Sequence, residues 1–248
     1  MKFSIVTASF NSAKTIEKTL ASVQAQTHGD VEHIIADGAS NDGTADLVRR
    51  EAPEAKLYVE PDKGIYDGMN KGIAKATGDV IVLLNSDDYY AHPGVLTDIA
   101  AVFDRTGADA VFADIAFFDP ANPDRTTRHY RSNRFSPSRL KYGIMPAHPG
   151  MFLKRAIYDT LGPYAEGFPL SADFEFVARM FAKAHPSYVF HPEIVVKMLP
   201  GGASTRSFMS KIRIFNECIE ACRINGIKTS KLMMLGKYPI KLADYIAA

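Results

Sequence analysis

The stretch VLLNSDDYY, residues 82–90, joins an apolar run to two consecutive aspartates. Residues 79–84 read as a buried strand, because apolar side chains follow one another from position 80 to position 84. Two carboxylates about 5 Å apart repel by roughly 3 kcal/mol at an effective dielectric of about 20. A divalent cation would reverse that repulsion, because hard cations bind carboxylate oxygens. Asp87 and Asp88 therefore indicate a strand end that binds a cation, with a capped turn leading to Pro93 as the alternative.

Strand-like and helix-like segments alternate on both sides of this stretch. The predicted strands are 3–8, 31–36, 56–59, 79–84, 110–117 and about 188–196, and the predicted helices follow Asn11 or cover 44–50, 65–76, 95–103, about 172–184 and about 208–225. Such alternation is typical of an α/β fold with a mostly parallel central sheet and helices on both faces. Residues 118–139, rich in Pro, Asn, Ser and Arg, are predicted to form a long loop or an excursion over the site.

The composition limits the classes of function. With 248 residues and 46% apolar content, the chain can bury one elaborated domain. A net charge of +1 provides no global field for gathering a nucleic acid. Two cysteines four residues apart cannot form a disulfide framework. We expect neither a signal peptide nor a membrane-spanning helix, because the apolar runs are too short, and we expect a reducing cytoplasmic setting.

Short polar side chains follow the first two predicted strands. TASFN, residues 7–11, ends the first strand, and DGASNDGT, residues 37–44, follows the second. The carboxyl ends of parallel strands form the ligand-binding edge of such sheets. A turn followed by a helix cap is the alternative for the second segment. A helix–loop–helix calcium site fits poorly, because Ala39 and Val48 would occupy its third and twelfth positions.

The third predicted strand leads into DKGIYDGMNKG, residues 62–72. A solvated helix with charge pairs accounts for most of its polar residues. Gly68 and Gly72 each cost a helix about 1 kcal/mol relative to Ala, which indicates a close approach to the helix backbone. The polar residues around the start of this helix are Asp62, Lys63, Tyr66, Asp67, Asn70 and Lys71. Of these, Lys63, Asp67 and either Asn70 or Lys71 could share one face.

Three further residues are candidates for the site. Asp173 begins a predicted helix, where helix capping is the alternative role. His148 lies in the irregular segment PAHPG. If the strand that starts at 79 stays extended, Asn85 and Asp87 point to one face and Asp88 to the other. We then expect Asp87 to be the principal cation ligand, beside a neutral Asn85.

Taken in order, the chain resembles a family 2 glycosyltransferase with the GT-A fold. The resemblance rests on TASFN, DGASNDGT, DKGIYDGMNKG, LLNSDD, HPGMF, SADFEF and GGAST, and it covers about residues 1–207. It implies a GT-A domain over 1–207, with a donor-binding half of about 1–117 and an acceptor-side half of about 118–207. Residues 208–248 would then form a C-terminal helical extension.

The resemblance also implies roles for individual residues. Asp173 matches the catalytic carboxylate, a general base for an acceptor hydroxyl, and His148 falls on the acceptor side. Asp87 and Asp88 match the metal motif for Mn²⁺ or Mg²⁺, with Asn85 where its first aspartate usually stands. Residues implied in donor binding are Thr7, Ser9, Asn11, Asp37, Lys63, Asp67, Asn70, Lys71, Asn85, Ser86 and Arg206.

The implied activity is an inverting transfer from a nucleotide-diphosphate sugar, with a UDP-sugar favoured and a GDP-sugar as the alternative. The acceptor would be a glycan or a lipid-linked hydroxyl, in polysaccharide, glycolipid or cell-envelope glycan synthesis. Processive relatives carry a C-terminal motif with tryptophan, and this chain has no tryptophan, so we expect one sugar per encounter.

The tail 228–248 mixes lysines with apolar residues. We expect a helix packed on the domain, with a peripheral contact to the inner face of the cell membrane or a homodimer contact as alternatives.

Two other functions fit less well. A sugar-1-phosphate nucleotidyltransferase would carry a Gly-rich basic loop after the first strand, and TASFNSAK has neither glycine nor arginine. A nucleotide-sugar-binding scaffold without turnover would explain Asn85, although Asp87 and Asp173 argue for catalysis.

Overall fold

The computed structural model describes residues 1–119, 121–199 and 208–236. Within them, nine strands form one curled sheet in the order β3-β2-β1-β4-β8-β6-β9-β5, with β7 paired to β6. The strands are β1 (Phe3–Ser9), β2 (Val31–Asp37), β3 (Lys56–Val59), β4 (Val80–Leu83), β5 (Asp88–Tyr90), β6 (Ala110–Asp119), β7 (Asn122–Tyr130), β8 (Met151–Lys154) and β9 (Tyr188–Met198). The helices are α1 (Ile16–Gln24), α2 (Thr44–Glu51), α3 (Ile65–Ile73), α4 (Val95–Thr106), α5 (Arg155–Leu161), α6 (Ala172–Arg179), α7 (Phe208–Ile224) and α8 (Lys231–Leu235).

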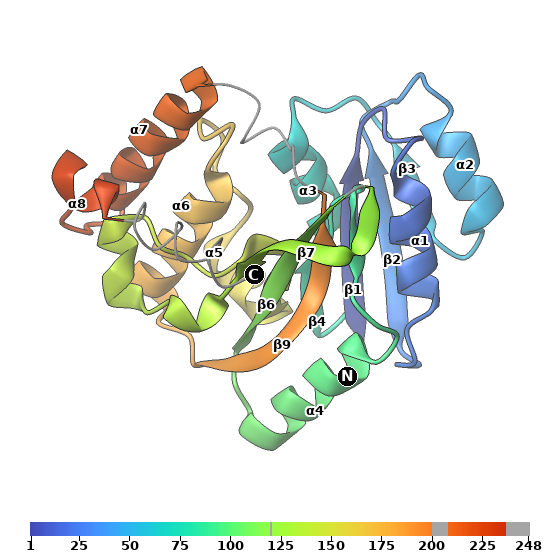
Figure 1. The fold of residues 1–248 in the computed structure, drawn as a ribbon, viewed down its shortest axis with the longest axis horizontal. Coiled ribbons are helices and arrows are strands. Elements are labelled where there is room, and N and C mark those ends of the chain that lie inside the picture. Colours follow the sequence, from blue (N-terminus) through green and yellow to red (C-terminus); the bar gives the residue numbers. More distant parts are fainter. Residues whose placement is uncertain (120, 200–207, 237–248) are drawn as a thin grey trace.

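The first half of the sheet is parallel, as the alternation of segments predicts. Strands β3, β2, β1 and β4 run parallel to one another, and every residue of β1 and β4 is buried. Successive side chains of β1 serve opposite faces. Ile5 packs in the cluster that includes α4, whereas Val6 packs with Met69 of α3. Helices therefore cover both faces, as Figure 1 shows, and the expected α/β architecture is confirmed.

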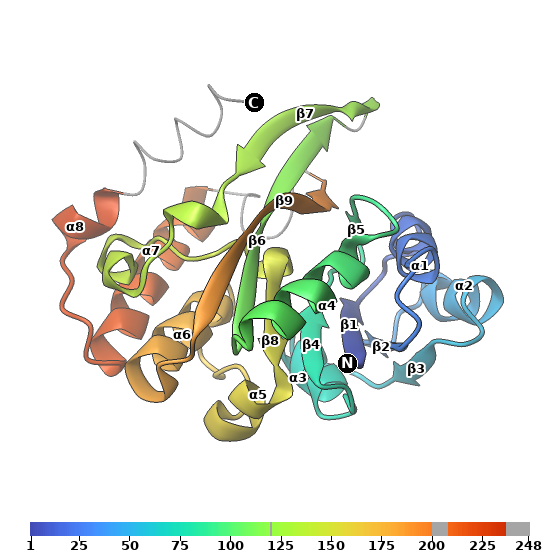
Figure 2. The same ribbon diagram turned by 90° about the horizontal axis from the view of Figure 1, so that it is seen from below.

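The second half of the sheet is mixed. Strand β8 pairs antiparallel with both β4 and β6, while β9 runs parallel to β6. The expected long loop at 118–139 is wrong for Asn122–Tyr130, which forms β7, antiparallel to β6. Figure 2 shows the two strands extending together beyond the rest of the sheet. Because no described side chain of β7 is fully buried, its polar composition does not reveal a strand.

The last described segment packs on the domain as two helices. Helix α7 contacts α6 and buries Cys218, Ala221 and Cys222, which places both cysteines in the core as small apolar residues. Helix α8 buries Met234 but leaves Leu232 80% exposed. No described helix is both long enough and apolar enough to cross a membrane.

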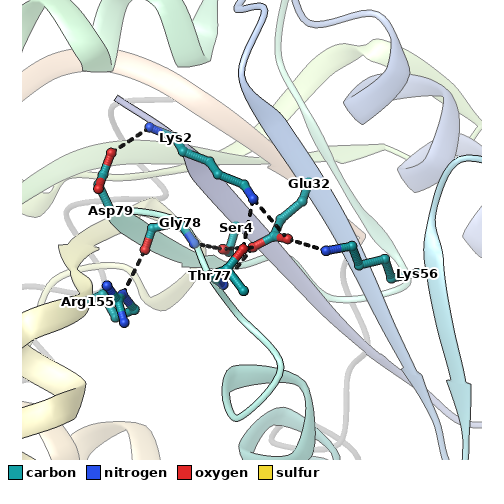
Figure 3. A network of polar contacts seen from close by, with 8 residues as sticks. All are labelled: Lys2, Ser4, Glu32, Lys56, Thr77, Gly78, Asp79 and Arg155. Atoms are coloured by element: carbon teal, nitrogen blue, oxygen red, sulfur yellow. Dashed lines mark hydrogen bonds and ion pairs between the residues drawn. The ribbon is translucent and has the colours of Figure 1, made fainter.

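A buried carboxylate joins the amino-terminal ends of the parallel strands (Figure 3). Glu32 accepts hydrogen bonds from Ser4 Oγ at 2.5 Å, from the backbone and hydroxyl of Thr77 at 2.7 and 2.9 Å, and from Lys56 Nζ at 2.7 Å. Burial acts to raise the pKa of Glu32, but these bonds prevail and hold it well below its usual range. The network leaves the opposite, carboxyl-terminal edge to the polar residues of the site.

Candidate active site

Two loops at the carboxyl edge are tied together by short polar side chains. Ser9 Oγ donates to Asp37 Oδ1 at 2.9 Å, and Ser40 donates to both Asp37 oxygens, by its hydroxyl at 2.6 Å and its backbone N–H at 2.8 Å. The backbone N–H of Asn11 donates to Ser40 Oγ at 2.8 Å. Asn11 and Ala39 both adopt positive φ angles, 50° and 60°. The structure therefore brings Ser9, Asn11 and Asp37 together in one ordered rim.

Thr7 does not lie where the sequence suggests, and Phe10 adds a residue to the site. Thr7 is fully buried, and its hydroxyl forms a hydrogen bond with His33 Nε2 at 3.0 Å. Thr7 therefore joins two strands and does not face the expected nucleotide-binding side, which corrects its predicted role in binding a sugar donor. Burial lowers the pKa of His33 to about 3, which keeps that imidazole neutral. Phe10, which sequence reasoning passed over, is 61% exposed, and its ring lies beside Gly38 at the rim. A lone aromatic residue among small polar ones at a strand end is the signal that could have identified it.

The two glycines of α3 are explained by contacts with the strands. A Cβ at Gly72 would collide with Val6 Cγ1, and one at Gly68 would lie 3.3 Å from the Cβ of Ala8. The close approach that the glycines indicate is therefore made by β1, which sets the first turns of α3 against the carboxyl end of that strand. This packing places the α3 side chains at the same edge as Asp37.

Most polar side chains at the start of α3 and within it form hydrogen bonds with other parts of the chain. Asn70 clamps Tyr164, donating to its carbonyl at 3.0 Å and accepting from its N–H at 2.8 Å. Asp67 accepts from the backbone N–H of Lys63 at 3.0 Å and lies 3.4 Å from Lys71 Nζ. Lys71 also donates to the carbonyl of Pro61 at 2.5 Å. Of the four candidates, the Lys63 side chain is the one that stays exposed.

The segment after β4 is a turn, not an extended strand, which corrects the expected pairing of side chains. The N–H of Asp88 donates to the carbonyl of Asn85 at 3.1 Å, closing the turn. The Asn85 side-chain amide then donates to Asp88 Oδ2 at 3.0 Å, so Asn85 lies beside Asp88 instead of sharing a face with Asp87. Ser86 Oγ bonds Ser12 Oγ at 2.8 Å, joining this turn to the loop after β1.

The chemistry of this turn fits a divalent cation. Among the described residues, Asp88 Oδ1 and Asn85 Oδ1 are buried oxygens without a hydrogen-bond partner. Burial raises the pKa of Asp87, and burial together with the neighbouring charge of Asp87 raises that of Asp88 well above its usual range. A cation would supply the partner that these oxygens lack and would favour both carboxylates in their charged form. Asp87 is only half-buried and is the more accessible ligand.

Asp173 lies in the first turn of α6 and is contacted by a side chain of α3. Tyr66 donates its hydroxyl proton to Asp173 Oδ1 at 2.9 Å, and the N–H of Phe174 donates to the same oxygen at 2.8 Å. His148 Nε2 bonds the hydroxyl of Tyr164 at 3.0 Å. Burial lowers the pKa of His148, against the opposing charge of Asp173, so the imidazole is neutral at pH 7. The structure thus assembles Asp173 and His148 around Tyr66 and Tyr164, two tyrosines to which the sequence assigned no role in the site.

A cavity of about 250 Å³ opens between the start of α3 and the segment before α6. Lys63, Tyr66 and Asn70 line one wall, and residues 164–169 line the other. Arg206, the expected cation of the Gly-rich loop, lies outside the described residues.

A family model described as Glycosyl transferase family 2 matches residues 4–162. The chain belongs to glycosyl transferase family 2. This family 2 glycosyltransferase is 30% identical over 185 residues to the PGL/p-HBAD biosynthesis glycosyltransferase of Mycobacterium bovis (strain BCG / Pasteur 1173P2), a match that covers 73% of this chain and 70% of the relative.

Solved structures show that the family 2 glycosyltransferase has the GT-A fold. S. aureus TarS (residues 1–349) in complex with UDP-GlcNAc superposes with a TM-score of 0.72 at 19% identity, over 92% of this chain and 66% of that one. The mannosyltransferase PcManGT of Pyrobaculum calidifontis, in complex with GDP-Man and Mn²⁺, gives a TM-score of 0.67 at 18% identity, over 99% of this chain and 73% of that one. This chain spans only 39% of a longer TarS structure.

Proposed function

We propose that this glycosyltransferase moves one sugar from a nucleotide-diphosphate sugar to an acceptor hydroxyl with inversion at the anomeric carbon. The observation that carries the proposal is the arrangement at the carboxyl edge. A half-buried carboxylate at the start of α6 is connected through Tyr66 to α3, and α3 packs on the end of the strand that leads to the Asp37 rim. A proton acceptor therefore lies on the side of the sheet where a nucleotide would bind.

The donor nucleotide would bind across the ends of β1 and β2. Asp37 accepts three hydrogen bonds, two of them on Oδ1, so Oδ2 keeps capacity for a base N–H. The exposed ring of Phe10 offers a surface on which a base can stack. TarS with UDP-GlcNAc and PcManGT with GDP-Man support a nucleotide-sugar donor, of either the uridine or the guanosine type.

The diphosphate would lie at the turn after β4. Asp87, with Asp88 as the second carboxylate, would hold Mn²⁺ or Mg²⁺, which supplies positive charge against the diphosphate as it leaves. The exposed Lys63, just before α3, would be the nearby described cation free to contact the same group, because Lys71 donates to the carbonyl of Pro61. Mn²⁺ in the PcManGT complex supports the choice of metal.

Asp173 would act as the general base. Its carboxylate takes the proton of the acceptor hydroxyl as the oxygen attacks the anomeric carbon, and the bond from that carbon to the diphosphate oxygen breaks. A positioned base of this kind contributes about 10²–10⁴-fold to the rate. His148, neutral and held by Tyr164, is available on the acceptor side as a hydrogen-bonding group. A relative named for PGL/p-HBAD biosynthesis supports a glycolipid acceptor.

Two variants test the proposal with separate readouts. Asp87→Ala should remove the effect of Mn²⁺ on nucleotide affinity in calorimetry, whereas Asp173→Asn should bind the nucleotide normally and release no nucleotide diphosphate. A panel of UDP-glucose, UDP-GlcNAc and GDP-mannose identifies the donor. Near-normal turnover by Asp173→Asn refutes its role as the base, and an unchanged Mn²⁺ effect in Asp87→Ala refutes the metal assignment. Donor binding without turnover by the unmodified protein favours the scaffold.

A further inference from the structure

The hydrogen bonds at Asp173 are unevenly divided between its two oxygens. Tyr66 Oη and the N–H of Phe174 both donate to Oδ1, at 2.9 and 2.8 Å. Within the ranges 1–119, 121–199 and 208–236, no hydrogen bond to Oδ2 is formed. One oxygen is thus fixed by two donors, and the other is left to accept a proton.

We propose that Tyr66 is a positioning residue that fixes the Asp173 carboxylate through Oδ1 and presents Oδ2 to the acceptor hydroxyl. This inference rests on the proposed role of Asp173 as the base and adds a residue, 107 positions away in the chain, that makes the carboxylate competent. A carboxylate that is free to rotate would adopt the reactive orientation only part of the time. Even a small displacement of a catalytic group from the reactive geometry lowers the rate of the reaction.

Tyr66 is itself held in place by its surroundings. Its ring lies 5.6 Å from that of Tyr164, centroid to centroid, and Tyr164 is 1% exposed. Asn70, one turn further along α3, bonds both backbone groups of Tyr164. The helix starts after Gly64, whose φ of 129° is strained for any residue with a side chain. The hydroxyl is therefore fixed from both the helix and the facing segment.

The charge environment keeps Tyr66 a donor. Burial, followed by the negative charge of Asp173, raises the pKa of Tyr66 well above its usual range, so its proton stays on the phenol at any working pH. Among the described residues, the other titratable groups that act on this pair are His148, Tyr164 and Glu217 of α7. His148 and Tyr164 are neutral at pH 7, and the Glu217 carboxylate is paired with Arg213 Nε at 2.9 Å. The hydrogen bond that Tyr66 donates stabilises the charged form of the Asp173 carboxylate.

The test compares Tyr66→Phe with the unmodified protein. Release of nucleotide diphosphate is followed from about pH 5 to 9, with whichever of UDP-glucose, UDP-GlcNAc or GDP-mannose the unmodified protein uses. We expect kcat to fall at least about tenfold, and the acidic limb to move up by about one pH unit, since a hydrogen bond to a charged group is lost. KM for the donor should stay within about twofold. Tyr142→Phe, at the end of the short 3-10 helix Pro137–Tyr142 that contacts α8, is the matched control and should behave like the unmodified protein.

A second measurement does not need turnover. Carbon-13 NMR of labelled aspartate follows the Asp173 carboxyl, assigned by its absence in Asp173→Asn, and its titration midpoint should rise in Tyr66→Phe. An unchanged midpoint and an unchanged pH profile overturn the inference even if Asp173→Asn is inactive. If the unmodified protein releases nucleotide diphosphate from none of the three donors, the proposed function fails instead. The NMR result still decides the role of Tyr66.

Discussion

Replacing Glu32 by Gln should make the free energy of unfolding less dependent on pH in the acidic range. The Glu32 side chain is 6% exposed, and Lys56 donates to it at 2.7 Å. A glutamine oxygen can still accept from Ser4 and Thr77, but its amide cannot accept from Lys56. A hydrogen bond to a charged group contributes about 1.5–3 kcal/mol, so we expect a loss of about 2 kcal/mol at pH 7.

The sign of the pH effect follows from the lowered pKa of Glu32. The contribution is fully present above the ordinary value of 4.5 and is lost as the pH falls, because the unfolded chain takes up the proton first. At about pH 3.5 the unfolded state gains about 1.4 kcal/mol by binding that proton. The difference between the unmodified protein and Glu32→Gln should therefore narrow from about 2 to about 0.6 kcal/mol.

Urea unfolding at the two pH values, followed by circular dichroism, measures both differences. Glu54→Gln is the control, because Glu54 is exposed at the surface, and it should change the free energy of unfolding by less than about 0.5 kcal/mol at either pH. A Glu32→Gln difference that stays constant between pH 7 and 3.5 would show that the charge of Glu32 does not stabilise the fold.

Three other changes probe the rim, the core and the last described helix, α8. Phe10→Ala should weaken nucleotide binding in calorimetry by about 1–3 kcal/mol, the usual value of one base stacked on an aromatic ring. Gly72→Ala should lower the free energy of unfolding by about 1–2 kcal/mol, because the collision with Val6 outweighs the better helix propensity of Ala. Leu232→Ser with Leu235→Ser should reduce co-sedimentation with anionic vesicles without lowering the melting temperature, since both side chains are exposed.

The first two of these variants have matched controls. Ile224→Ala changes an apolar residue that is 47% exposed on α7 and should leave nucleotide affinity unaltered. Gly29→Ala adds a methyl group into open space and should not destabilise. Equal vesicle binding by the double serine variant and the unmodified chain would refute a membrane contact through α8. An unchanged affinity in Phe10→Ala would place the base away from that ring.

The parallel half of the sheet and the position of Asp173 follow from the sequence because they depend on local pattern. Apolar runs that alternate with helical periodicity give β1 to β4 and their helices, and a carboxylate before a helix with inward apolar residues gives α6. Strand β7 does not follow, because it pairs along one edge and buries too little to need apolar residues.

Contacts between distant segments could not be predicted in the same way. The turn that puts Asn85 beside Asp88 depends on Asp88 entering β5, which pairs with the end of β9. The bond from Tyr66 to Asp173 depends on how α3 and α6 face each other. The burial of Thr7 against His33 reflects the register of β1 and β2. None of these leaves a periodic signal in the chain.

The bond between the hydroxyls of Ser12 and Ser86 has a thermodynamic consequence for ligand binding. It joins the loop that leads to the Asp37 rim with the turn that carries Asp87, two segments 74 residues apart. A ligand that orders one segment reduces the entropy that the other still has to lose. Base and cation should then assist each other's binding, and the gain must be the same in both directions.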